Sequence, residues 1–250
     1  KYFVRAFAEN TQGISYGNVV SVINYGNPCL AKVNSFGCVD CDTKYALNDY
    51  AVGDTFMLNN IIRVVADKTM IINALANGDD VTQFCTSLIT DMSGLFYGES
   101  TFNQDIGSWD VSRVTDMTNM FFDAESFNQD IGNWNLLNVI SMKNMFAEAT
   151  AFNQDIGDWA VKRVREYYGM FNRASAFNQD IGDWDVSAVQ YGGSYLGMNR
   201  MFREASSFNQ DLSNWCVINI PSTLLQPAPA SFSTGSALTA SNHPIWGTCP

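Results

Sequence analysis

Five short segments of this chain place an asparagine and an aspartate at a fixed spacing, and their oxygens are the groups that could do chemistry. The sequence Phe-Asn-Gln-Asp-Ile begins at Phe102, Phe127, Phe152 and Phe177, and a variant begins at Phe208. The asparagines are Asn103, Asn128, Asn153, Asn178 and Asn209, and the aspartates are Asp105, Asp130, Asp155, Asp180 and Asp211. Amide and carboxylate oxygens accept hydrogen bonds and coordinate hard cations.

These two columns of polar residues leave several roles open. If the segments stack as parallel strands about 4.8 Å apart, like charges repel unless something compensates them. Each aspartate could accept backbone N–H bonds in its own turn, as Asn and Asp commonly do. Alternatively, aspartate pairs with asparagine amides, a cation bridges the column, or the asparagines and aspartates of the four full copies form a ligand-binding face.

The run from Asn178 to Asp185 is the best calcium candidate. Asn178, Asp180, Asp183 and Asp185 place oxygen ligands at alternating positions, as calcium loops do. The last two acidic positions vary among the other copies, so the sequence predicts no firm metal site and no other cofactor.

The chain lacks the residue constellations of the common catalytic sites. The single histidine, His243, lies in a proline-rich tail and cannot anchor a Ser-His-Asp arrangement. No phosphate loop, His-Glu-x-x-His motif or dinucleotide fingerprint is present. Because the carboxylates form a repeated column rather than a unique pair, glycosidase chemistry is not expected. We therefore expect a protein that is not an enzyme.

Composition narrows the class of partner. The chain has 250 residues and a net charge of −11, with 46% hydrophobic and 16% charged residues. This composition supports a core and disfavours disorder. A nucleic-acid partner is not expected, because phosphate binding needs a basic stripe. No apolar run approaches the roughly 20 residues of a membrane span.

The polar columns belong to a repeat of about 25 residues that must position them. A tryptophan follows each copy at a constant offset, at Trp109, Trp134, Trp159, Trp184 and Trp215, and a Met-Phe pair leads into each later copy. Such a period is typical of stacked units that bury one another's apolar faces. We expect a short helix over 116–121 and a short strand over 127–131. The tryptophans could form core or stack on sugar rings.

One copy carries an insertion. Six extra residues precede Met201, in the segment from Tyr191 to Gly197. Insertions in repeats form loops on one face, often the binding face, and Tyr with Gly and Ser is typical of adaptable contact loops. Tyr191 and Tyr195 are therefore the predicted non-repetitive contact residues.

The six cysteines flank the repeats. They are Cys29, Cys38, Cys41, Cys85, Cys216 and Cys249. An even count favours disulfides formed in an oxidising compartment. We expect Cys216 to pair with Cys249, because they alone follow the repeats, and the other four to pair among themselves. A metal or redox role for the Cys38–Cys41 spacing is an alternative.

The chain is predicted to have four parts. Residues 1–24 show two strand patterns, 25–85 form a cysteine-containing linker and N-terminal cap, 86–215 form the repeat array, and 216–250 form a C-terminal cap. In the N-terminal cap we expect a β-hairpin from Val52 to Val65 around Asn59-Asn60 and a helix from Thr69 to Ala76 that ends near Asn77-Gly78.

The repeat from Phe-Asn-Gln-Asp-Ile to Met-Phe resembles the BspA-like bacterial surface-protein repeat, a divergent relative of leucine-rich repeats that is abundant in mycoplasmas. Residues 1–24 resemble the last hairpin of a fibronectin type III domain. The resemblance implies an α/β repeat solenoid and a secreted or cell-surface location. It also implies adhesion or ligand binding to a surface protein or glycan. A structural spacer or filament segment that contacts copies of itself or neighbouring modules is the alternative.

Overall fold

The computed structural model describes residues 51–58, 61–192, 195–220 and 229–250. The chain divides into a first unit, Lys1–Leu88 with Ser108–Asp110, and a second unit, Ile89–Gly107 with Val111–Pro250. The strands expected in residues 1–24 and the fibronectin-like hairpin lie outside the described residues. So do Cys29, Cys38 and Cys41.

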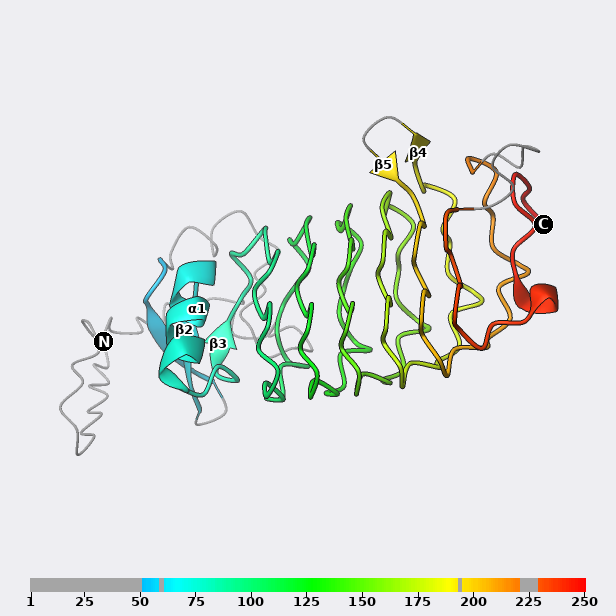
Figure 1. The fold of residues 1–250 in the computed structure, drawn as a ribbon. Helices are drawn as coiled ribbons and strands as arrows, with labels where there is room; N and C mark the ends of the chain where they lie inside the picture. The colour runs from blue at the N-terminus through cyan, green and yellow to red at the C-terminus, as the bar shows by residue number, and fades with distance from the viewer. Residues whose placement is uncertain (1–50, 59–60, 193–194, 221–228) are drawn as a thin grey trace. The chain divides into compact units, whose positions relative to one another are not determined.

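The first unit contains the regular secondary structure that its sequence predicts. Strand β1 (Thr55–Leu58) pairs antiparallel with β2 (Ile61–Val65), and Leu58 lies opposite Ile61. The predicted hairpin is therefore confirmed. A short strand that the sequence did not indicate, β3 (Phe84–Cys85), pairs parallel with β2 and completes a three-stranded sheet of order β1-β2-β3 (Figure 1).

Helix α1 (Lys68–Asn77) connects β2 to β3 and is bounded by local signals. The Asp67 side chain caps its start by accepting the Met70 N–H at 2.8 Å. Gly78 ends it with a left-handed φ of 74°, and its N–H returns to the carbonyl of Leu75. Ile71 and Ala74 are its buried residues. The helix expected from Thr69 to Ala76 is confirmed.

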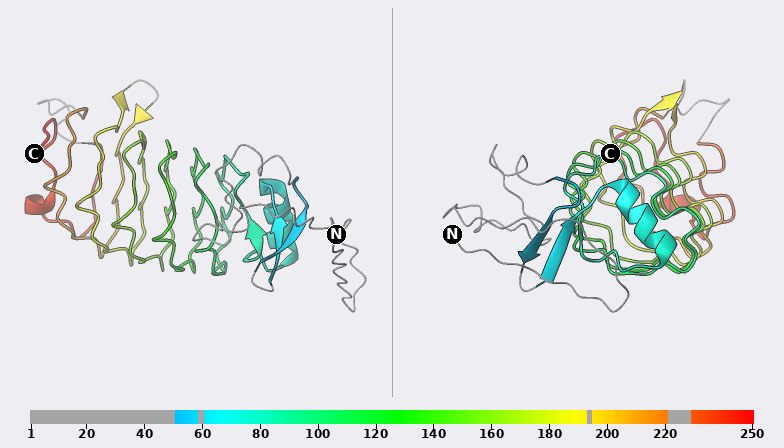
Figure 2. Two further views of the ribbon diagram at one scale, coloured as in Figure 1. Left: turned by 180° about the vertical axis from the view of Figure 1, so that it is seen from behind. Right: turned by 90° about the vertical axis from the view of Figure 1, so that its left-hand side faces the viewer.

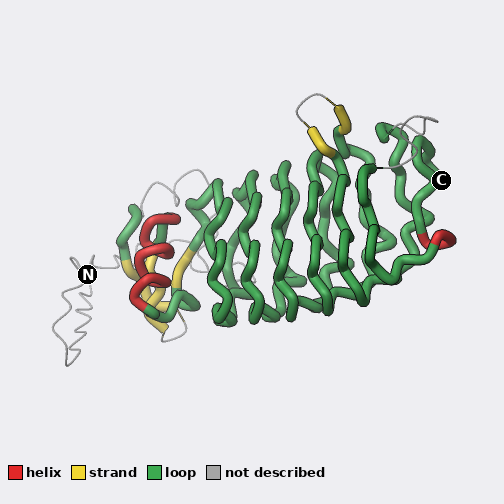
Figure 3. The backbone as a smooth tube through the Cα atoms, in the orientation of Figure 1, coloured by secondary structure: helices red, strands yellow, loops and turns green. Residues whose placement is uncertain are grey.

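The second unit is a stack of coils with little helix or strand, as the colouring of Figure 3 makes plain. We number the coils by residue: coil 1 is 89–107 with 111–114, coil 2 is 115–139, coil 3 is 140–164, coil 4 is 165–189 and coil 5 is 190–220. The coils lie side by side in Figure 1 and follow closely similar paths when viewed along the stack in Figure 2 (right).

Alternate backbone N–H groups of each coil donate to the next coil. Between segments 117–123 and 141–147, every second residue donates to every second carbonyl, at N···O distances of 2.8–3.0 Å. The same pattern joins 92–98 to 116–122, 142–148 to 166–172 and 167–173 to 197–203. Parallel bridges at Asp91, Asp116, Ser141 and Glu166 continue this register. These alternate N–H groups therefore find their hydrogen-bond partners in a neighbouring coil.

The structure differs from the helix expected over 116–121. Asn119 and Asp123 take left-handed φ values of 56° and 59°, which an α-helix excludes. The intervening N–H groups close successive turns, from Met120 to Met117 and from Phe122 to Asn119. Residues 127–131 form no strand either. These residues have the apolar spacing of a helix, but alternate backbone N–H groups donate to the next coil instead of along a helix.

Two columns of phenylalanines fill the core of the stack. Phe121, Phe146 and Phe171 stack at centroid distances of 5.4 and 5.7 Å, nearly parallel. Phe146 also stacks on Phe152 of its own coil at 4.0 Å. All the phenylalanines of the two columns are buried: Phe96, Phe102, Phe121, Phe127, Phe146, Phe152, Phe171, Phe177, Phe202 and Phe208. Burial of these rings contributes to the apolar stabilisation of the unit.

A short β-ribbon accommodates the insertion. Strand β4 (Tyr191–Gly192) pairs antiparallel with β5 (Tyr195–Leu196). The Gln190 N–H still donates to Arg165, and Gly197 still accepts from Tyr167, so the six extra residues leave the register of coil 5 intact. The ribbon projects from the coils in Figure 1.

Residues 229–248 close the stack after coil 5. The backbone N–H groups of Arg200, Phe202 and Glu204 donate to carbonyls of residues 230, 232 and 234. The Phe232 ring meets Phe202 edge-on, at 84°, and so ends the series of parallel rings. The 3-10 helix η2 (Ala240–Asn242) follows. The tail thus supplies the acceptors that another coil would have supplied.

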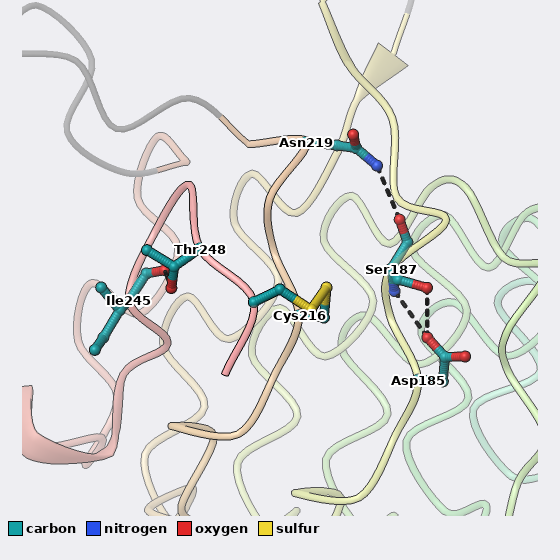
Figure 4. Close-up of a disulfide and its surroundings, with 7 residues drawn as sticks. Asp185, Ser187, Cys216, Asn219, Ile245 and Thr248 are labelled. Atoms are coloured by element: carbon teal, nitrogen blue, oxygen red, sulfur yellow. Dashed lines mark hydrogen bonds between the residues drawn. A yellow bond between two sulfur atoms is a disulfide. The ribbon is translucent and has the colours of Figure 1, made fainter.

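A disulfide joins Cys216 to Cys249, the pair expected from the sequence. Figure 4 shows it beside Thr248, whose carbonyl accepts the Val217 N–H at 2.9 Å. The two cysteines are 33 residues apart, and a crosslink over such a loop destabilises the unfolded chain by about 3–4 kcal/mol. The bridge therefore holds the tail against the last coil.

Candidate functional site: the polar ladders and the exposed side chains

The five asparagines form a ladder that links successive coils. The Oδ1 of Asn128 accepts the backbone N–H of Asn153 at 2.9 Å and the side-chain amide of Gln154 at 2.9 Å. The same pair of bonds recurs at Asn103, Asn153 and Asn178. At the end of the stack Asn209 accepts from Thr239 and from the side chain of Asn242. These oxygens are occupied within the fold.

The glutamines of the last four motifs have a role that the sequence did not reveal. Gln154 also donates to the backbone carbonyl of Asn128 at 2.9 Å, and Gln129, Gln179 and Gln210 make the equivalent bond. The repeated Asn-Gln pair could have predicted this bond, because the Asn oxygen of one coil and the Gln amide of the next are a matched acceptor and donor.

The five aspartates accept backbone N–H bonds within their own coils. Oδ1 of Asp130 accepts from Gly132 at 3.0 Å, and the residue two positions on plays this part at Asp105, Asp155, Asp180 and Asp211. At Asp211 the bond from Ser213 lowers the pKa of the carboxyl. Of the roles considered for these aspartates, the structure shows the one in which each closes its own turn. The aspartate side chains remain exposed.

A close contact explains the glycine that follows each of the four full motifs. A Cβ on Gly132 would lie 2.7 Å from the backbone oxygen of Asp155 in the next coil. Gly107, Gly157 and Gly182 are equally restricted. No real side chain tolerates such a distance without a shift of the backbone. The glycine is therefore required by the spacing of the coils.

The tryptophans lie in the core of the stack. Trp134, Trp159 and Trp184 are 3% exposed, and Trp215 is fully buried. Each indole N–H donates to the carbonyl of the isoleucine in the preceding motif, as from Trp159 to Ile131 at 3.1 Å. Since both the ring and its N–H are used inside the fold, these residues are not placed to stack on a sugar.

The calcium candidate is not assembled as a cation site. Asn178 accepts from Asn209 and Gln210, Asp180 accepts from Gly182, and Asp185 accepts the N–H and hydroxyl of Ser187 (Figure 4). Asp183 is exposed. Among the described residues, no three His, Cys, Asp or Glu side chains group in a way that could hold a metal ion.

The predicted tyrosine contacts lie on the β-ribbon. Tyr191 of β4 is half-buried and lies opposite Leu196, while Tyr195 of β5 lies opposite Gly192. The side chain of Tyr195 falls outside the described part of the structure. A Cβ added to Gly197 would lie 3.0 Å from Cδ2 of the Tyr191 ring, so this tyrosine packs against the base of the ribbon.

Two adjacent tyrosines in coil 4 point to opposite sides of the coil. Tyr167 replaces the methionine of the other coils and is fully buried, and its hydroxyl donates to Val161 at 3.3 Å. Burial, with a smaller contribution from Asp185, raises the pKa of Tyr167 well above its usual value. Tyr168 is half-buried, and Lys143 and Arg200 lie over its ring at 5.5 and 5.9 Å.

Other cations of the same coils are used in ion pairs. Arg173 lies between Glu148 and Glu204, with N···O distances of 3.5 and 2.8 Å. Arg203 also pairs with Glu204 at 2.7 Å. The Arg173 bond lowers the pKa of Glu204, and the same bond raises the pKa of Arg173. These pairs are exposed and contribute little to stability.

The closest approach to a catalytic pair lies in the C-terminal cap. Ser233 Oγ and His243 Nε2 are 3.1 Å apart, and burial lowers the pKa of His243. No carboxylate contact to this imidazole occurs among the described residues. The His243 ring instead meets Phe232 edge-on at 5.8 Å, so the pair lies within the packing of the cap.

Cys85, in the first unit, is buried, and its Sγ lies 3.5 Å from the hydroxyl of Ser87. Its predicted partners, Cys29, Cys38 and Cys41, are outside the described residues. In the parts of the chain that are described, no helix has the length and apolar character to cross a bilayer.

Near-identical coils joined by matched ladders define a repeat protein. The chain belongs to the family described as "Mycoplasma protein of unknown function, DUF285", whose model matches residues 66–184 and 141–226. The two matched ranges overlap, as expected for a repeated sequence. No curated protein and no solved structure matches the chain.

Proposed function

We propose that this chain is a non-enzymatic binding module that acts outside the cell and contacts a surface protein or glycan. One observation supports this most: the repeated side chains are used inside the stack. The Phe and Trp rings are buried, and the Asn, Gln and Asp groups bond to backbone or to each other. The exposed residues that differ among coils are then the ones available for recognition.

The proposed architecture is a solenoid related to leucine-rich repeats. The parallel bridges and the regular coil-to-coil ladder support it. Deleting residues 115–139, one full period, should preserve the fold, because Asn103 would then meet the Asn-Gln pair at Asn153. Deleting residues 115–138 should be more destabilising, because coil 1 then meets coil 3 one residue out of register. Equal melting curves for the two deletions would contradict the proposal.

The disulfide and the family support a secreted or cell-surface location. A disulfide persists in oxidising compartments, and Cys216 and Cys249 are joined in the structure. Surface proteins that bind ligands also benefit from a fixed scaffold, since a rigid site loses less entropy on binding.

The competing role is a spacer or filament segment. The C-terminal tail supports the binding module, because residues 230–234 already bond to the last coil and occupy its ladder. A second copy would have to displace the tail, which the disulfide holds.

The test combines ligand arrays with oligomeric state. A binding module should be monomeric at micromolar concentration by analytical ultracentrifugation and should bind a defined member of a matrix-protein or polysaccharide array. Replacing Tyr191 and Tyr195 with Ser tests whether the ribbon contributes, with Tyr97→Ser as an exposed control. Self-association without any array signal would favour the spacer and overturn the proposal.

A further inference from the structure

We propose that Lys143, Tyr168 and Arg200 form a binding site for an anionic polysaccharide, with the polymer lying along the stack. This inference rests on the proposed binding function and assigns a ligand class to it. We call these three residues the cationic cluster. They come from three consecutive coils, 3, 4 and 5.

The geometry of the cationic cluster is fixed by the backbone. Lys143 and Tyr168 occupy equivalent positions, and Arg200 lies one residue beyond the next equivalent position, Asn199. The Tyr168 carbonyl accepts from Asn144 at 2.7 Å, and the Arg200 N–H donates to Ala230 at 3.0 Å. The backbone positions that carry the three side chains are therefore fixed before a ligand arrives, which reduces the entropy lost on binding.

The two cations of the cluster are not neutralised by the protein. Lys143 and Arg200 both lie over the Tyr168 ring, and within the described residues neither forms an ion pair. Arg173 and Arg203, from the same coils, do pair with glutamates. A cation held by a ring keeps its full charge, so the cluster can still bind an external anion.

The distribution of charge along the stack supports a local site in an acidic protein. Residues 141–203 contain seven Lys and Arg and seven acidic residues, whereas residues 89–140 contain one cation, Arg113, and eight acidic residues. The later coils therefore repel an anionic ligand less than the first coils do, and the unpaired cations of the cluster can attract it locally.

A linear polysaccharide fits the spacing better than a compact anion does. Lys143 and Arg200 are two coils apart, roughly 10 Å along the stack for a parallel strand spacing. An extended disaccharide is of similar length, so a polymer with one charge per disaccharide could meet both cations.

The test measures binding of three labelled probes by fluorescence anisotropy over a salt series. The probes are a heparin oligosaccharide, a hyaluronan oligosaccharide and polyglutamate. The variant is Lys143→Gln with Arg200→Gln. The control is Arg113→Gln with Lys162→Gln, which removes two exposed cations elsewhere. Matching melting temperatures establish that both proteins fold.

We expect at least one polysaccharide to bind and the cluster variant to weaken it roughly tenfold or more, because charge-assisted contacts are lost. The control should weaken it less than about threefold, as for a remote charge. Preference for heparin would identify sulfate, and equal binding of hyaluronan would identify carboxylate.

Three results would overturn the inference: no binding of either polysaccharide, equal losses in variant and control, or polyglutamate binding as well as the polysaccharides. If the arrays yield a ligand that the cluster variant binds normally, only this inference fails. If they yield none and the protein self-associates, the proposed function itself fails.

Discussion

Two segments with the same apolar spacing adopt different backbones. Residues 68–77 form α1, whereas residues 117–124 form successive turns in coil 2. In α1, Asp67 and Gly78 bound a segment whose hydrogen bonds close within itself. In coil 2, alternate N–H groups donate to coil 3. An apolar residue every three to four positions therefore places the side chains on one face. It does not determine whether the backbone N–H groups bond within the segment or to a neighbouring coil.

The largest expected effect concerns the rings that make coils depend on each other. Phe146→Ala removes a buried ring that stacks on Phe121, Phe152 and Phe171. We expect a loss of about 3–5 kcal/mol in the free energy of unfolding. Chemical denaturation would measure it.

Tyr97→Ala is the matched control, because Tyr97 stacks on Phe122 but is 57% exposed. It should cost less than about 1.5 kcal/mol. Similar losses for the two variants would mean that the ring columns do not carry the stability of the second unit.

Two positions require glycine for different reasons: Gly132 because the next coil is close, and Gly78 because its backbone is left-handed. Gly132→Ala should cost about 1–3 kcal/mol, because the new Cβ meets the Asp155 carbonyl of the next coil. Gly78→Ala, at the end of α1, should cost about 1 kcal/mol, because its φ is 74° while the space around it is open.

The Asn variants distinguish these two reasons. Gly78→Asn should recover part of the loss, since Asn tolerates a left-handed φ. Gly132→Asn should be at least as destabilising as Gly132→Ala. Thermal melts of the four proteins provide the measurement, and recovery at Gly132 would contradict the close-contact explanation.

Substitution by Ala and by Gly should change stability in opposite directions at Asn73, which is exposed, and Asp123, which is half-buried. Asn73→Ala in α1 should stabilise by a few tenths of a kcal/mol, because Ala favours a helix, and Asn73→Gly should destabilise. At Asp123, whose φ is 59°, Ala should destabilise by about 1 kcal/mol and Gly should not. Urea denaturation of the four variants would show the reversal. The same sign at both positions would mean that residues 117–124 behave as a helix.

The smallest expected effect is a pH dependence that arises in the C-terminal cap. Burial lowers the pKa of His243 in the folded protein, so the unfolded chain binds its proton more readily. The contribution of His243 to stability is therefore complete above about pH 6.5 and is lost as the pH falls below that value. Melting temperatures between pH 7.5 and 5 should decline, and His243→Gln should flatten the decline.

The acids with lowered pKa values do not obscure this window. The pKa values of Glu204 and Asp211 lie below their usual range because of bonds from Arg173 and Ser213. Their contributions are present above about pH 4.5 and are lost only as the pH falls through the folded values. An unchanged slope in His243→Gln would assign the decline to another group.

The sequence was most informative where structure is set by near neighbours in the chain. The hairpin of β1 and β2 followed from a turn pair between apolar runs, and α1 followed from its spacing and its terminal glycine. The aspartate turns also followed from local chemistry, since each carboxylate accepts from a residue two positions away. The helix over 116–121 was wrong, because that prediction considered only contacts within the segment.

The candidate cationic cluster could not be identified by reading along the chain. Lys143, Tyr168 and Arg200 are separated by 25 and 32 residues, and Arg200 shifts by one place relative to its neighbours. The insertion before Met201 further obscures their common register. Only the paired ladders of coils 3, 4 and 5 bring the two cations to one ring.

The sequence by itself determined the period, the buried ring columns and the acids that close turns, because these depend on residue type and spacing. The tertiary structure decided which atoms the asparagines serve. An Asn Oδ1 can accept from its own turn or from a neighbour, and the choice depends on where the next coil lies. With that coil in place, Asn128 accepts from Asn153 and Gln154, and the repeated motif binds one coil to the next.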